Sequence, residues 1–509
     1  METHKQQPPN HPRVGRVKSF KLIAGGNVKQ AHGPDQVLSK KDGTYRGMGL
    51  DFLLTLLSNE TMKRPLHASW WKALVLVLWI FMTGSRTTCA APANIVLIMA
   101  DDLGYECLGV NGSTSYQTPH LDAIAAKGLR FEHCYSQPLC TPSRVQIMTG
   151  RYNHANYTHF GYLNPKEVTF GNLAKQAGYA TCIAGKWQLN GLTYQLDRYQ
   201  DPTRPNDAGF DEYCLWQLTQ PKSKGERYAR PLIEQNGQLL DRNDDAYGPD
   251  VFTDFLIDFM ERHRDEPFLA YYPMVLTHDP FVPTPKSPEW ATQRNKKDKA
   301  FFADMVHYMD HLVGRIHQSL EDLGLSEKTL LLFTADNGTH RSIRSQIAHG
   351  WIQGGKGTTP NAGTHVPFIA YWKGQTPAGE TSMDLIDFSD ILPTLAEAMQ
   401  TRHPQPKRVE GRSFLPQLKG EKGSPRSWTY CWYDPLWGNL GQYKNQFVRN
   451  QRFKLYQDGR FFDIMNDALE QSALTSPSIS ESSRSSYQQL LDGLATMPTW
   501  APKPANKKP

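Results

Sequence analysis

The sequence predicts an α/β fold, in which a large, mostly parallel mixed sheet lies between layers of helices and a small antiparallel subdomain follows. Two observations favour this fold. From residue 93 onward, short apolar runs alternate with amphipathic segments, which is typical of a sheet with helices on both faces. After about residue 425, short aromatic segments separated by polar turns replace that pattern, which indicates antiparallel strands.

Individual elements of the main sheet can be assigned from apolar runs. The first buried strand is expected at residues 94–100, which are apolar after the first residue. Further strands are expected at residues 179–184, 268–275, 329–335 and 366–372. A helix is expected to begin at Thr118-Pro119, which supply a cap and an N1 proline, and to end at Gly128. A longer helix is expected over residues 300–323, where apolar residues recur at helical spacing.

Composition excludes several classes of protein. Hydrophobic residues make up 39% of the 509 residues, so fibrous and wholly disordered chains are excluded. No apolar run reaches the length of a membrane span, and seven cysteines are too few for a disulfide scaffold. The net charge of +6 comes from the N-terminal segment, because 43 basic and 45 acidic residues follow from residue 90. No nucleic-acid partner is expected from that balance.

The N-terminal segment resembles an export signal that begins late. Residues 73–82 are continuously apolar, and small residues follow around Cys89. The basic residues that precede the run are Lys63, Arg64 and Lys72. We therefore expect a signal peptide at residues 62–91, with export to the periplasm or the exterior and no stable membrane span. An internal core helix is the alternative interpretation.

Further domain boundaries follow from the same patterns. Residues 1–61 are expected to be a leader or an over-called start, since Met62 stands where a signal peptide would begin. We expect a catalytic domain at residues 92–425, an antiparallel subdomain at 426–490 and a disordered tail at 491–509.

Hard oxygen ligands follow two of the expected strands. Asp101-Asp102 comes after the first strand, and Asp336-Asn337-Gly338 comes after the strand at 329–335. Ligands of parallel sheets lie at the carboxyl ends of strands, and carboxylates meeting there would repel one another without a cation. Oxygen ligation favours Ca²⁺ or Mg²⁺. A helix cap and a turn are the alternative interpretation of the two segments.

A third element is Cys140-Thr141-Pro142-Ser143-Arg144, followed by a helix-like segment. Pro142 suits the first turn of a helix, so Cys140 is expected at a helix N-terminus, where an anion is favoured. A buried, inert cysteine is the alternative.

With these motifs, the chain resembles the formylglycine-dependent sulfatases of the alkaline-phosphatase-like superfamily. The resemblance extends in order from about Ala93 to Leu474, and Asn94 to Arg151 match closely. The matching segments are NIVLIMADDLGY, TPHLDAIAAKGLRF, CTPSR with TGR, GYATCIAGKW, THDPFVPTP, TADNG, GGKGTTPNAGTHVP and FKLYQDGRFFDIMNDALEQ.

The resemblance implies a mechanism. A formylglycine-generating enzyme would oxidise Cys140, and the hydrated aldehyde would bind a divalent cation, usually Ca²⁺, and attack sulfur with one hydroxyl. The second hydroxyl would then expel sulfate and regenerate the aldehyde. The implied metal ligands are Asp101, Asp102, Cys140 in modified form, Asp336 and Asn337. The implied cationic residues are Arg144, Lys186 and Lys356.

Three positions concern proton transfer and departures from the family. His278 matches the residue thought to protonate or stabilise the departing oxygen. Gln188 stands where the family commonly has a histidine, and glutamine cannot act as a base. His365 stands where an arginine is frequent. The Gln188 replacement leaves open whether another group takes the proton or sulfate expulsion is slower.

The expected function is therefore that of an exported sulfuric-ester hydrolase acting on a sulfated carbohydrate or another sulfate ester. A phosphonate or phosphodiester hydrolase of the same superfamily is one alternative. An inactive sulfated-glycan-binding relative is another, favoured by Gln188 and opposed by the intact maturation motif. One or two tryptophans are expected to line the cleft. The candidates are Trp187, Trp216, Trp351, Trp432 and Trp437.

Overall fold

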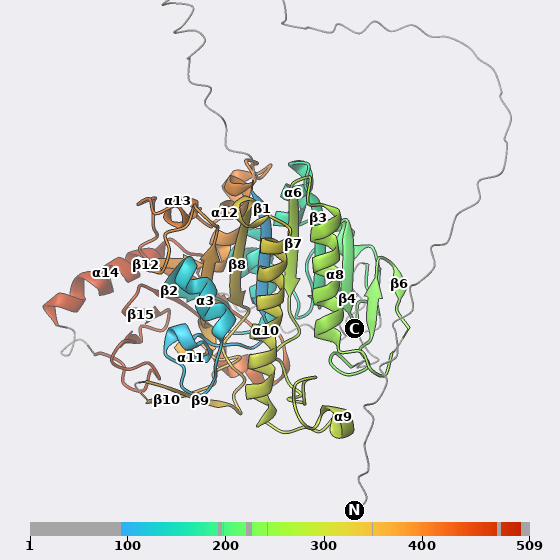
Figure 1. The fold of residues 1–509 in the computed structure, drawn as a ribbon. Coiled ribbons are helices and arrows are strands. Elements are labelled where there is room, and N and C mark those ends of the chain that lie inside the picture. Colours follow the sequence, from blue (N-terminus) through green and yellow to red (C-terminus); the bar gives the residue numbers. More distant parts are fainter. Residues whose placement is uncertain are drawn as a thin grey trace, which may run out of the picture. The chain divides into compact units, whose positions relative to one another are not determined.

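A ten-stranded mixed sheet forms the centre of the computed structural model (Figure 1). Its strands are β1 (Asn94–Ala100), β2 (Leu129–Tyr135), β3 (Ala180–Lys186), β4 (Glu212–Trp216), β5 (Ile233–Gln235), β6 (Gln238–Leu239), β7 (Phe268–Pro273), β8 (Thr329–Ala335), β11 (His365–Tyr371) and β12 (Glu380–Asp387). They lie in the order β12-β2-β11-β8-β1-β7-β3-β4-β5-β6. The central strands from β8 to β4 are parallel, and β11 and β5 run antiparallel to their neighbours.

The structure describes residues 93–499 except 192–195, 197, 220–225, 242, 349 and 476–479. The predicted leader (1–61) and signal peptide (62–91) lie outside these residues. In the described part of the chain, no helix has both the length and the apolar character needed to cross a bilayer.

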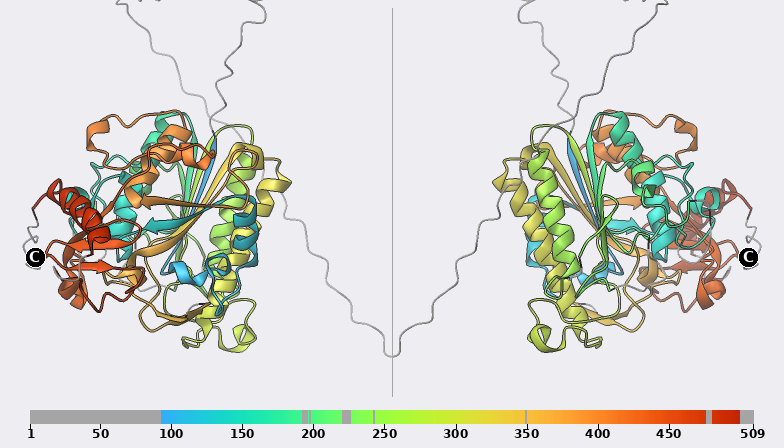
Figure 2. Two further views of the ribbon diagram at one scale, coloured as in Figure 1. Left: turned by 90° about the vertical axis from the view of Figure 1, so that its left-hand side faces the viewer. Right: turned by 90° about the vertical axis from the view of Figure 1, so that its right-hand side faces the viewer.

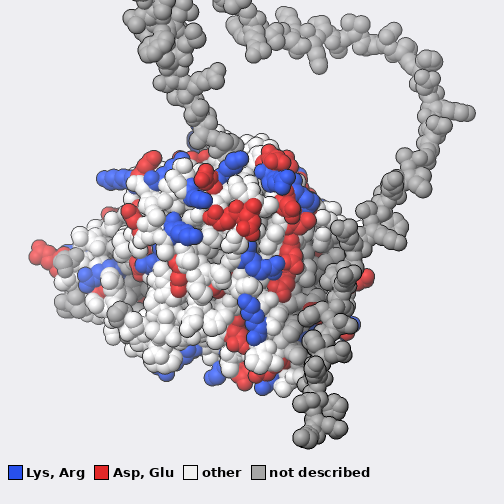
Figure 3. All heavy atoms as spheres, viewed as in Figure 1, with Lys and Arg blue, Asp and Glu red and all other residues white. Residues whose placement is uncertain are grey.

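Helices cover both faces of the sheet (Figure 2). One face carries α3 (Pro119–Lys127), α8 (Gly248–Arg262) and α10 (Phe301–Asp322). The other carries α4 (Cys140–Thr149), α6 (Phe170–Gln176) and α12 (Ile391–Ala398). Acidic and basic side chains are interspersed on the face shown in Figure 3. The other α-helices of the described residues are α5 (Asn153–Asn156), α7 (Arg204–Asp207), α9 (Trp290–Gln293), α11 (Asn361–Thr364), α13 (Leu415–Leu418) and α14 (Glu481–Ala495).

A separate four-stranded antiparallel sheet follows near the C-terminal end. It consists of β13 (Thr429–Tyr433), β14 (Asn445–Arg449), β15 (Phe453–Tyr456) and β16 (Phe461–Asp463). A short hairpin, β9 (Arg344–Ile347) and β10 (Gly350–Gln353), stands apart from both sheets. The helix α14 packs against β14 and β15. Because α14 continues to Ala495, the prediction that residues 491–495 belong to a disordered tail is wrong.

The predicted fold class is confirmed, with the small antiparallel sheet in place. Strands β1 and β8 have the predicted bounds, and the other three predicted strands agree within two residues. The antiparallel direction of β11 was not specified by its apolar pattern. Sequence analysis missed β2, because its residues LRFEHCY mix charged and apolar side chains.

The register of the central strands determines where their polar ends meet. Strands β1 and β8 pair in parallel from Asn94 and Thr329 to Ala100 and Ala335, and every residue of both is buried. Because the last pair is directly opposite, the residues that follow the two strands emerge side by side at one edge of the sheet.

Candidate active site

Four oxygen-bearing side chains meet at the carboxyl ends of β1 and β8, as predicted. The Asp102 amide donates to Asp336 Oδ1 at 3.1 Å. Asn337 Nδ2 donates to Asp102 Oδ1 at 2.9 Å. Asp101 follows β1 directly, and it is fully buried, as are the other three residues.

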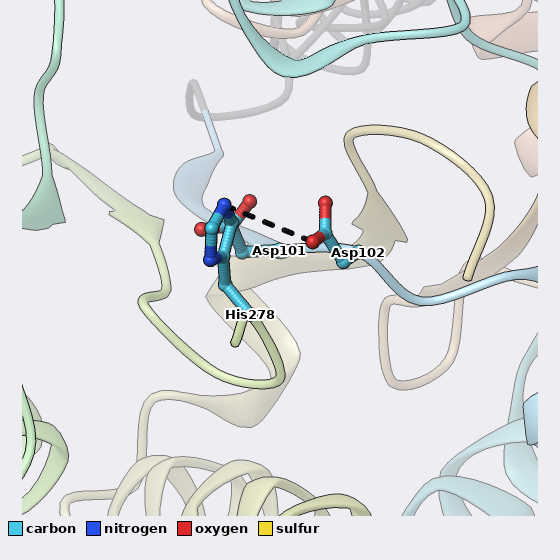
Figure 4. Close-up of side chains that lie close together, drawn as sticks. All are labelled: Asp101, Asp102 and His278. Atoms are coloured by element: carbon cyan, nitrogen blue, oxygen red, sulfur yellow. Dashed lines mark ion pairs between the residues drawn. The ribbon is translucent and has the colours of Figure 1, made fainter. Parts of the chain in front are cut away.

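His278 joins these carboxylates from the loop after β7. Ligand atoms of Asp101, Asp102 and His278 all lie within 4.8 Å of one another. Figure 4 shows the imidazole facing the two carboxylates, with His278 Nε2 at 3.8 Å from Asp102 Oδ2. The loop is fixed to the end of β1, because the Thr277 amide donates to the Asp101 carbonyl oxygen at 2.7 Å.

Each of the three carboxylates has a cation of its own. Lys186 Nζ donates to both oxygens of Asp101, at 2.7 and 3.0 Å. Lys356 Nζ lies 2.5 Å from Asp102 Oδ2, and Arg144 Nη2 lies 2.8 Å from Asp336 Oδ2. These cations, with the four oxygen-bearing residues and His278, form what we call the reaction cluster. All the predicted catalytic cations are therefore brought together with the predicted ligands.

The carboxylates differ in how easily they ionise. Burial opposes ionisation of Asp101, but the charges of Lys186 and Arg144 hold its pKa below the usual range. Burial and the nearby Asp101 charge raise the pKa of Asp336 to about 7. A cation bound between them would favour ionisation of both.

The donor set fits a divalent cation. Asn337 Oδ1 is buried and has no hydrogen-bond partner among the described residues. Buried polar atoms are normally paired, so this carbonyl oxygen has free capacity for a ligand. Carboxylate and amide oxygens suit Ca²⁺ and Mg²⁺. The three-residue group around Asp101 contains neither Asp336 nor Cys140, which remain predicted ligands.

Lys356 is placed by a close approach of two loops. Its amide donates to the Thr339 carbonyl oxygen at 3.0 Å, and the Gly338 amide donates to the Gly363 carbonyl oxygen at 3.1 Å. A Cβ atom at Gly338 would lie 1.8 Å from the Ala362 carbonyl oxygen. The glycine of the Asp-Asn-Gly segment is therefore required by packing as well as by the turn.

Cys140 begins α4, as predicted, and every residue of this helix is buried. The residue is 2% exposed, and its thiol lies 3.6 Å from Gln188 Oε1, to which it can donate. Burial raises the pKa of the Cys140 thiol. A protonated thiol is a weak nucleophile, so the unmodified side chain is poorly suited to attack.

Two non-glycine residues of the site have left-handed backbones. Asp102 has φ 64° and Gln188 has φ 53°. Such conformations cost about 1 to 3 kcal/mol and occur mainly where the surroundings fix a functional geometry. Both residues lie two positions beyond the end of a strand, Asp102 after β1 and Gln188 after β3, so the strain occurs where side chains are directed into the site.

Hydrogen bonds define the protonation of His278. Its Nδ1 lies 2.6 Å from the Asp279 carbonyl oxygen, which can only accept, so Nδ1 carries a proton. Its Nε2 lies 3.0 Å from Lys356 Nζ, an ammonium donor, so Nε2 accepts. The imidazole is therefore neutral, and burial with the Lys356 charge lowers its pKa well below the usual value. The proton between these two side chains is therefore on Lys356.

Sequence analysis missed Arg227. Its Nη1 lies 3.9 Å from Asp101 Oδ2, and its guanidinium carbon lies 4.1 Å from the ring centroid of Trp216. The next residue, Tyr228, donates its hydroxyl to the Val275 carbonyl oxygen at 2.9 Å, and also to that of His278. No motif surrounds Arg227. The available signal was a tryptophan at the end of a buried strand, followed within a short distance by an arginine.

The five candidate tryptophans have different surroundings. Trp187 and Trp432 are buried, and Trp437 stacks on Phe160 with ring centroids 4.4 Å apart. Trp351 is 53% exposed on the β9–β10 hairpin. Trp216 lines a pocket beside His278. One of the five therefore meets the expectation of lining a cleft at the site.

His365 lies outside the reaction cluster. It begins β11, stacks on Tyr105 with ring centroids 4.1 Å apart, and has Nε2 at 2.8 Å from the Glu132 carbonyl oxygen. The family departure at this position therefore concerns packing beside the sheet.

The family model described as Sulfatase matches residues 93–401. The chain belongs to the sulfatase family. N-acetylgalactosamine-6-sulfatase from Canis lupus familiaris is 31% identical over 395 residues, which cover 70% of this chain and 72% of the relative. Human arylsulfatase A is 33% identical over 373 residues, covering 66% and 70%. The protein is accordingly a sulfatase, an enzyme that hydrolyses sulfuric esters.

Solved structures share the fold. A protein crystallised with its substrate D-glucosamine-2-N,6-O-disulfate gives a TM-score of 0.64 at 21% identity, covering 80% of this chain and 98% of that one. The phosphonate monoester hydrolase of Agrobacterium radiobacter gives 0.56 at 18% identity, covering 79% and 95%. The sulfatase thus has the alkaline-phosphatase-like fold.

Proposed function

We propose that this sulfatase removes sulfate from a carbohydrate, using formylglycine made from Cys140 and a divalent cation, Ca²⁺ or Mg²⁺. The residues that would hold the cation are Asp101, Asp102, Asp336, Asn337 and the modified residue 140. The observation that carries the proposal is the position of Cys140 at the start of buried α4, within the electrostatic influence of Lys186, Asp336 and Lys356.

The modified residue and the cation supply the chemistry that the unmodified side chains lack. Formylglycine at position 140 would supply the nucleophilic hydroxyl group that the unmodified side chain lacks. A divalent cation, when bound, polarises a sulfate oxygen and lowers the pKa of the attacking hydroxyl.

The chain's own cations would bind and orient the sulfate. Arg144 is fixed at both ends of its fork, with Nη1 at 3.1 Å from the Lys186 carbonyl oxygen and Nη2 on Asp336. Its Nε is buried without a partner among the described residues, and is available to an anion. Lys186 and Lys356 add charge in a buried site, where charge stabilises a transition state strongly.

Proton transfer to the leaving group is assigned to Lys356 and His278 together. When the ester S–O bond breaks, the departing oxygen takes a proton from Lys356, and His278 Nε2 fixes the ammonium in position. The Asp279 carbonyl in turn fixes the imidazole through Nδ1. This assignment gives His278 a positioning role beside the donor.

The carbohydrate substrate is inferred from relatives. Similar chains are named N-acetylgalactosamine-6-sulfatase, and a protein of the same fold was crystallised with a sulfated glucosamine. Export of this sulfatase is proposed from the apolar run at residues 73–82 and its basic flank. Fusing residues 62–91 to a reporter enzyme and measuring its secretion tests that part separately.

The maturation test is mass spectrometry on peptides spanning residues 131–151. Enzyme produced together with a formylglycine-generating enzyme is expected to carry, at position 140, an aldehyde that reacts with a carbonyl reagent. Cys140→Ser provides the matched control, because it preserves size but removes the thiol that would be oxidised. An unmodified thiol in a preparation that hydrolyses aryl sulfate would refute the mechanism.

The metal test uses chelation and reconstitution. Removing divalent ions should abolish hydrolysis of an aryl sulfate, and Ca²⁺ or Mg²⁺ should restore it. Parallel assays with an aryl phosphonate and a phosphodiester address the related activities of the superfamily. Faster turnover of either than of sulfate esters would replace the proposed function.

A further inference from the structure

A pocket of about 700 Å³ adjoins the reaction cluster at His278. Its walls come from residues 216–217 and 226–229, from residues 278–280 and 282, and from Asn295 and Lys297. Cys140 and Lys186 do not line it. Because His278 lies beside the proposed proton donor, the pocket lies where the leaving alcohol would be held.

Arg227 connects this pocket with the reaction cluster. It lines the pocket, and its Nη1 approaches Asp101 Oδ2 to 3.9 Å, which is beyond hydrogen-bond distance. That Nη1 atom is buried and lacks a hydrogen-bond partner in the described part of the chain. Both oxygens of Asp101 already accept from Lys186, so Arg227 is not needed to neutralise this carboxylate.

Two contacts hold Arg227 in place. Its guanidinium stacks on Trp216 at the end of β4, which keeps the planar group oriented. The neighbouring Tyr228 is fully buried and is bonded to the loop that carries His278. An arginine so fixed loses little entropy on binding and offers its N–H groups to the oxygen atoms of a carboxylate or a sulfate.

The other charged residues of the pocket are less suited than Arg227 to bind an anion. Asp279 Oδ1 lies 3.1 Å from His278 Nδ1, and Glu226 and Lys297 are exposed. Among the described residues, the only carboxylate within 4.0 Å of the Arg227 guanidinium is Asp101. The buried, unpaired N–H is therefore the strongest anion-binding feature of the pocket.

From these contacts we infer that Arg227 binds an anionic group on the leaving sugar, so that this sulfatase prefers sulfate esters of acidic sugars. The inference rests on the proposed function. The anionic group would lie next to the scissile ester. It is either a uronate carboxylate or a second sulfate, which both present negatively charged oxygen atoms.

Two pairs of substrates test the inference and distinguish a uronate carboxylate from a second sulfate as the bound anion. The first pair is the methyl glycoside of a hexuronate 2-sulfate and the methyl ester of the same compound, which lacks the carboxylate charge. The second pair is glucosamine-N,6-disulfate and N-acetylglucosamine 6-sulfate. The anionic member of each pair carries an additional negative charge, and the neutral member carries only the charge of the scissile sulfate. The measured quantity is the ratio of kcat/KM for the anionic member over that for the neutral member.

Arg227→Met is the informative variant, because methionine keeps an unbranched apolar stem against Trp216. It should lower the ratio by about 10- to 100-fold in one of the two pairs, since a hydrogen bond to a charged group contributes about 1.5 to 3 kcal/mol. The pair that responds identifies the anion. Arg344→Met is the matched control, because Arg344 also stacks on a tryptophan, Trp351 at 5.0 Å, on the β9–β10 hairpin. The control should keep the wild-type ratio.

Two results would overturn the inference and one would overturn its premise. If Arg227→Met changes the ratio by less than about twofold from wild type in both pairs, Arg227 contacts the scissile sulfate or acts only in packing. A wild-type preference for the neutral member of both pairs also contradicts the inference. Failure of matured wild-type enzyme to hydrolyse any sulfate ester instead refutes the proposed function.

Discussion

Two clusters of buried carboxylates each accept a hydrogen bond from a side chain of α4, and they differ in how many of their buried polar atoms lack a hydrogen-bond partner. Arg144 of α4 reaches Asp336 in the reaction cluster. Gln146, on the same helix, donates to Asp387 Oδ1 at 2.6 Å. We call the second group, Asp387, Asp390 and Arg426, the Asp390 cluster.

The Asp390 cluster is satisfied by the protein itself. Arg426 Nε donates to Asp390 Oδ2 at 2.8 Å, Nη2 donates to Oδ1, and Nη1 donates to the Tyr152 hydroxyl at 3.0 Å. The Asp387 amide donates to Asp390 Oδ2 at 2.9 Å, and the Arg412 amide donates to Asp390 Oδ1 at 2.6 Å. This pattern is that of a structural cluster.

The reaction cluster and its neighbour Arg227 retain free capacity. Buried atoms without partners among the described residues include Asn337 Oδ1, Arg144 Nε and Arg227 Nη1. Both clusters bury carboxylates beside arginine, so burial and charge alone do not distinguish them. Unsatisfied donors and acceptors therefore distinguish the reaction cluster from the Asp390 cluster.

The largest effect is expected for Asp336→Asn. Removing one carboxylate charge should weaken cation binding and lower kcat by about a thousandfold or more, because metal polarisation contributes several kcal/mol. Kinetics and calorimetric Ca²⁺ binding measure both losses. The melting temperature of the metal-free variant should not fall, since like-charge repulsion is removed. A variant that binds Ca²⁺ normally would contradict the comparison.

A change in the Asp390 cluster should lower the stability of the protein and leave kcat unchanged. Arg426→Met leaves Asp390 buried without its cation, which should cost about 3 kcal/mol or more of stability. Urea unfolding measures this loss, while kcat of the folded fraction on an aryl sulfate should stay at the wild-type value. A large loss of kcat at full folding would show that the two clusters are coupled through α4.

A smaller effect on stability alone is expected from His365. Burial and the Arg449 charge lower its pKa from 6.5 to about 3, so it stays neutral when folded but protonates when unfolded. The unfolded state therefore binds more protons below pH 6.5, and stability falls as pH decreases from there towards 3. His365→Gln should reduce that slope by up to about 1.4 kcal/mol per pH unit. Melts at several pH values measure the slope, and equal slopes would exclude His365 as the cause.

The smallest effect is expected at Gln188, if another group of the reaction cluster accepts the proton. Alcohol and sulfate should then appear at equal rates from the first turnover. Gln188→His should change sulfate release by less than about threefold, or under about 1 kcal/mol in the barrier. Rapid-quench kinetics on both enzymes measure the two products. A burst of alcohol that Gln188→His removes would instead assign the missing base to this position.

The central sheet and the reaction cluster were predictable because short segments determine them. Apolar strands that end in Asp101-Asp102 and Asp336-Asn337 require only the rule for parallel sheets. Arg227 was not predictable, because it depends on side-chain contacts with Asp101, which is far away in sequence, and with Trp216, which no motif links to it. Strand β12 was also missed. It lies at the edge of the sheet and its first residues are polar, so no apolar run marks it.

The complete burial of α4 also limits when maturation can occur. A modifying enzyme needs to take the segment around Cys140 into its own active site, yet Cys140 is 2% exposed and every residue of the helix is buried. The proposed oxidation therefore has to precede folding, and the two processes compete in time. Chains that fold first would remain stable but permanently inactive. The yield of active sulfatase would then depend on folding rate, and slowing the folding of an otherwise unchanged chain would increase its specific activity.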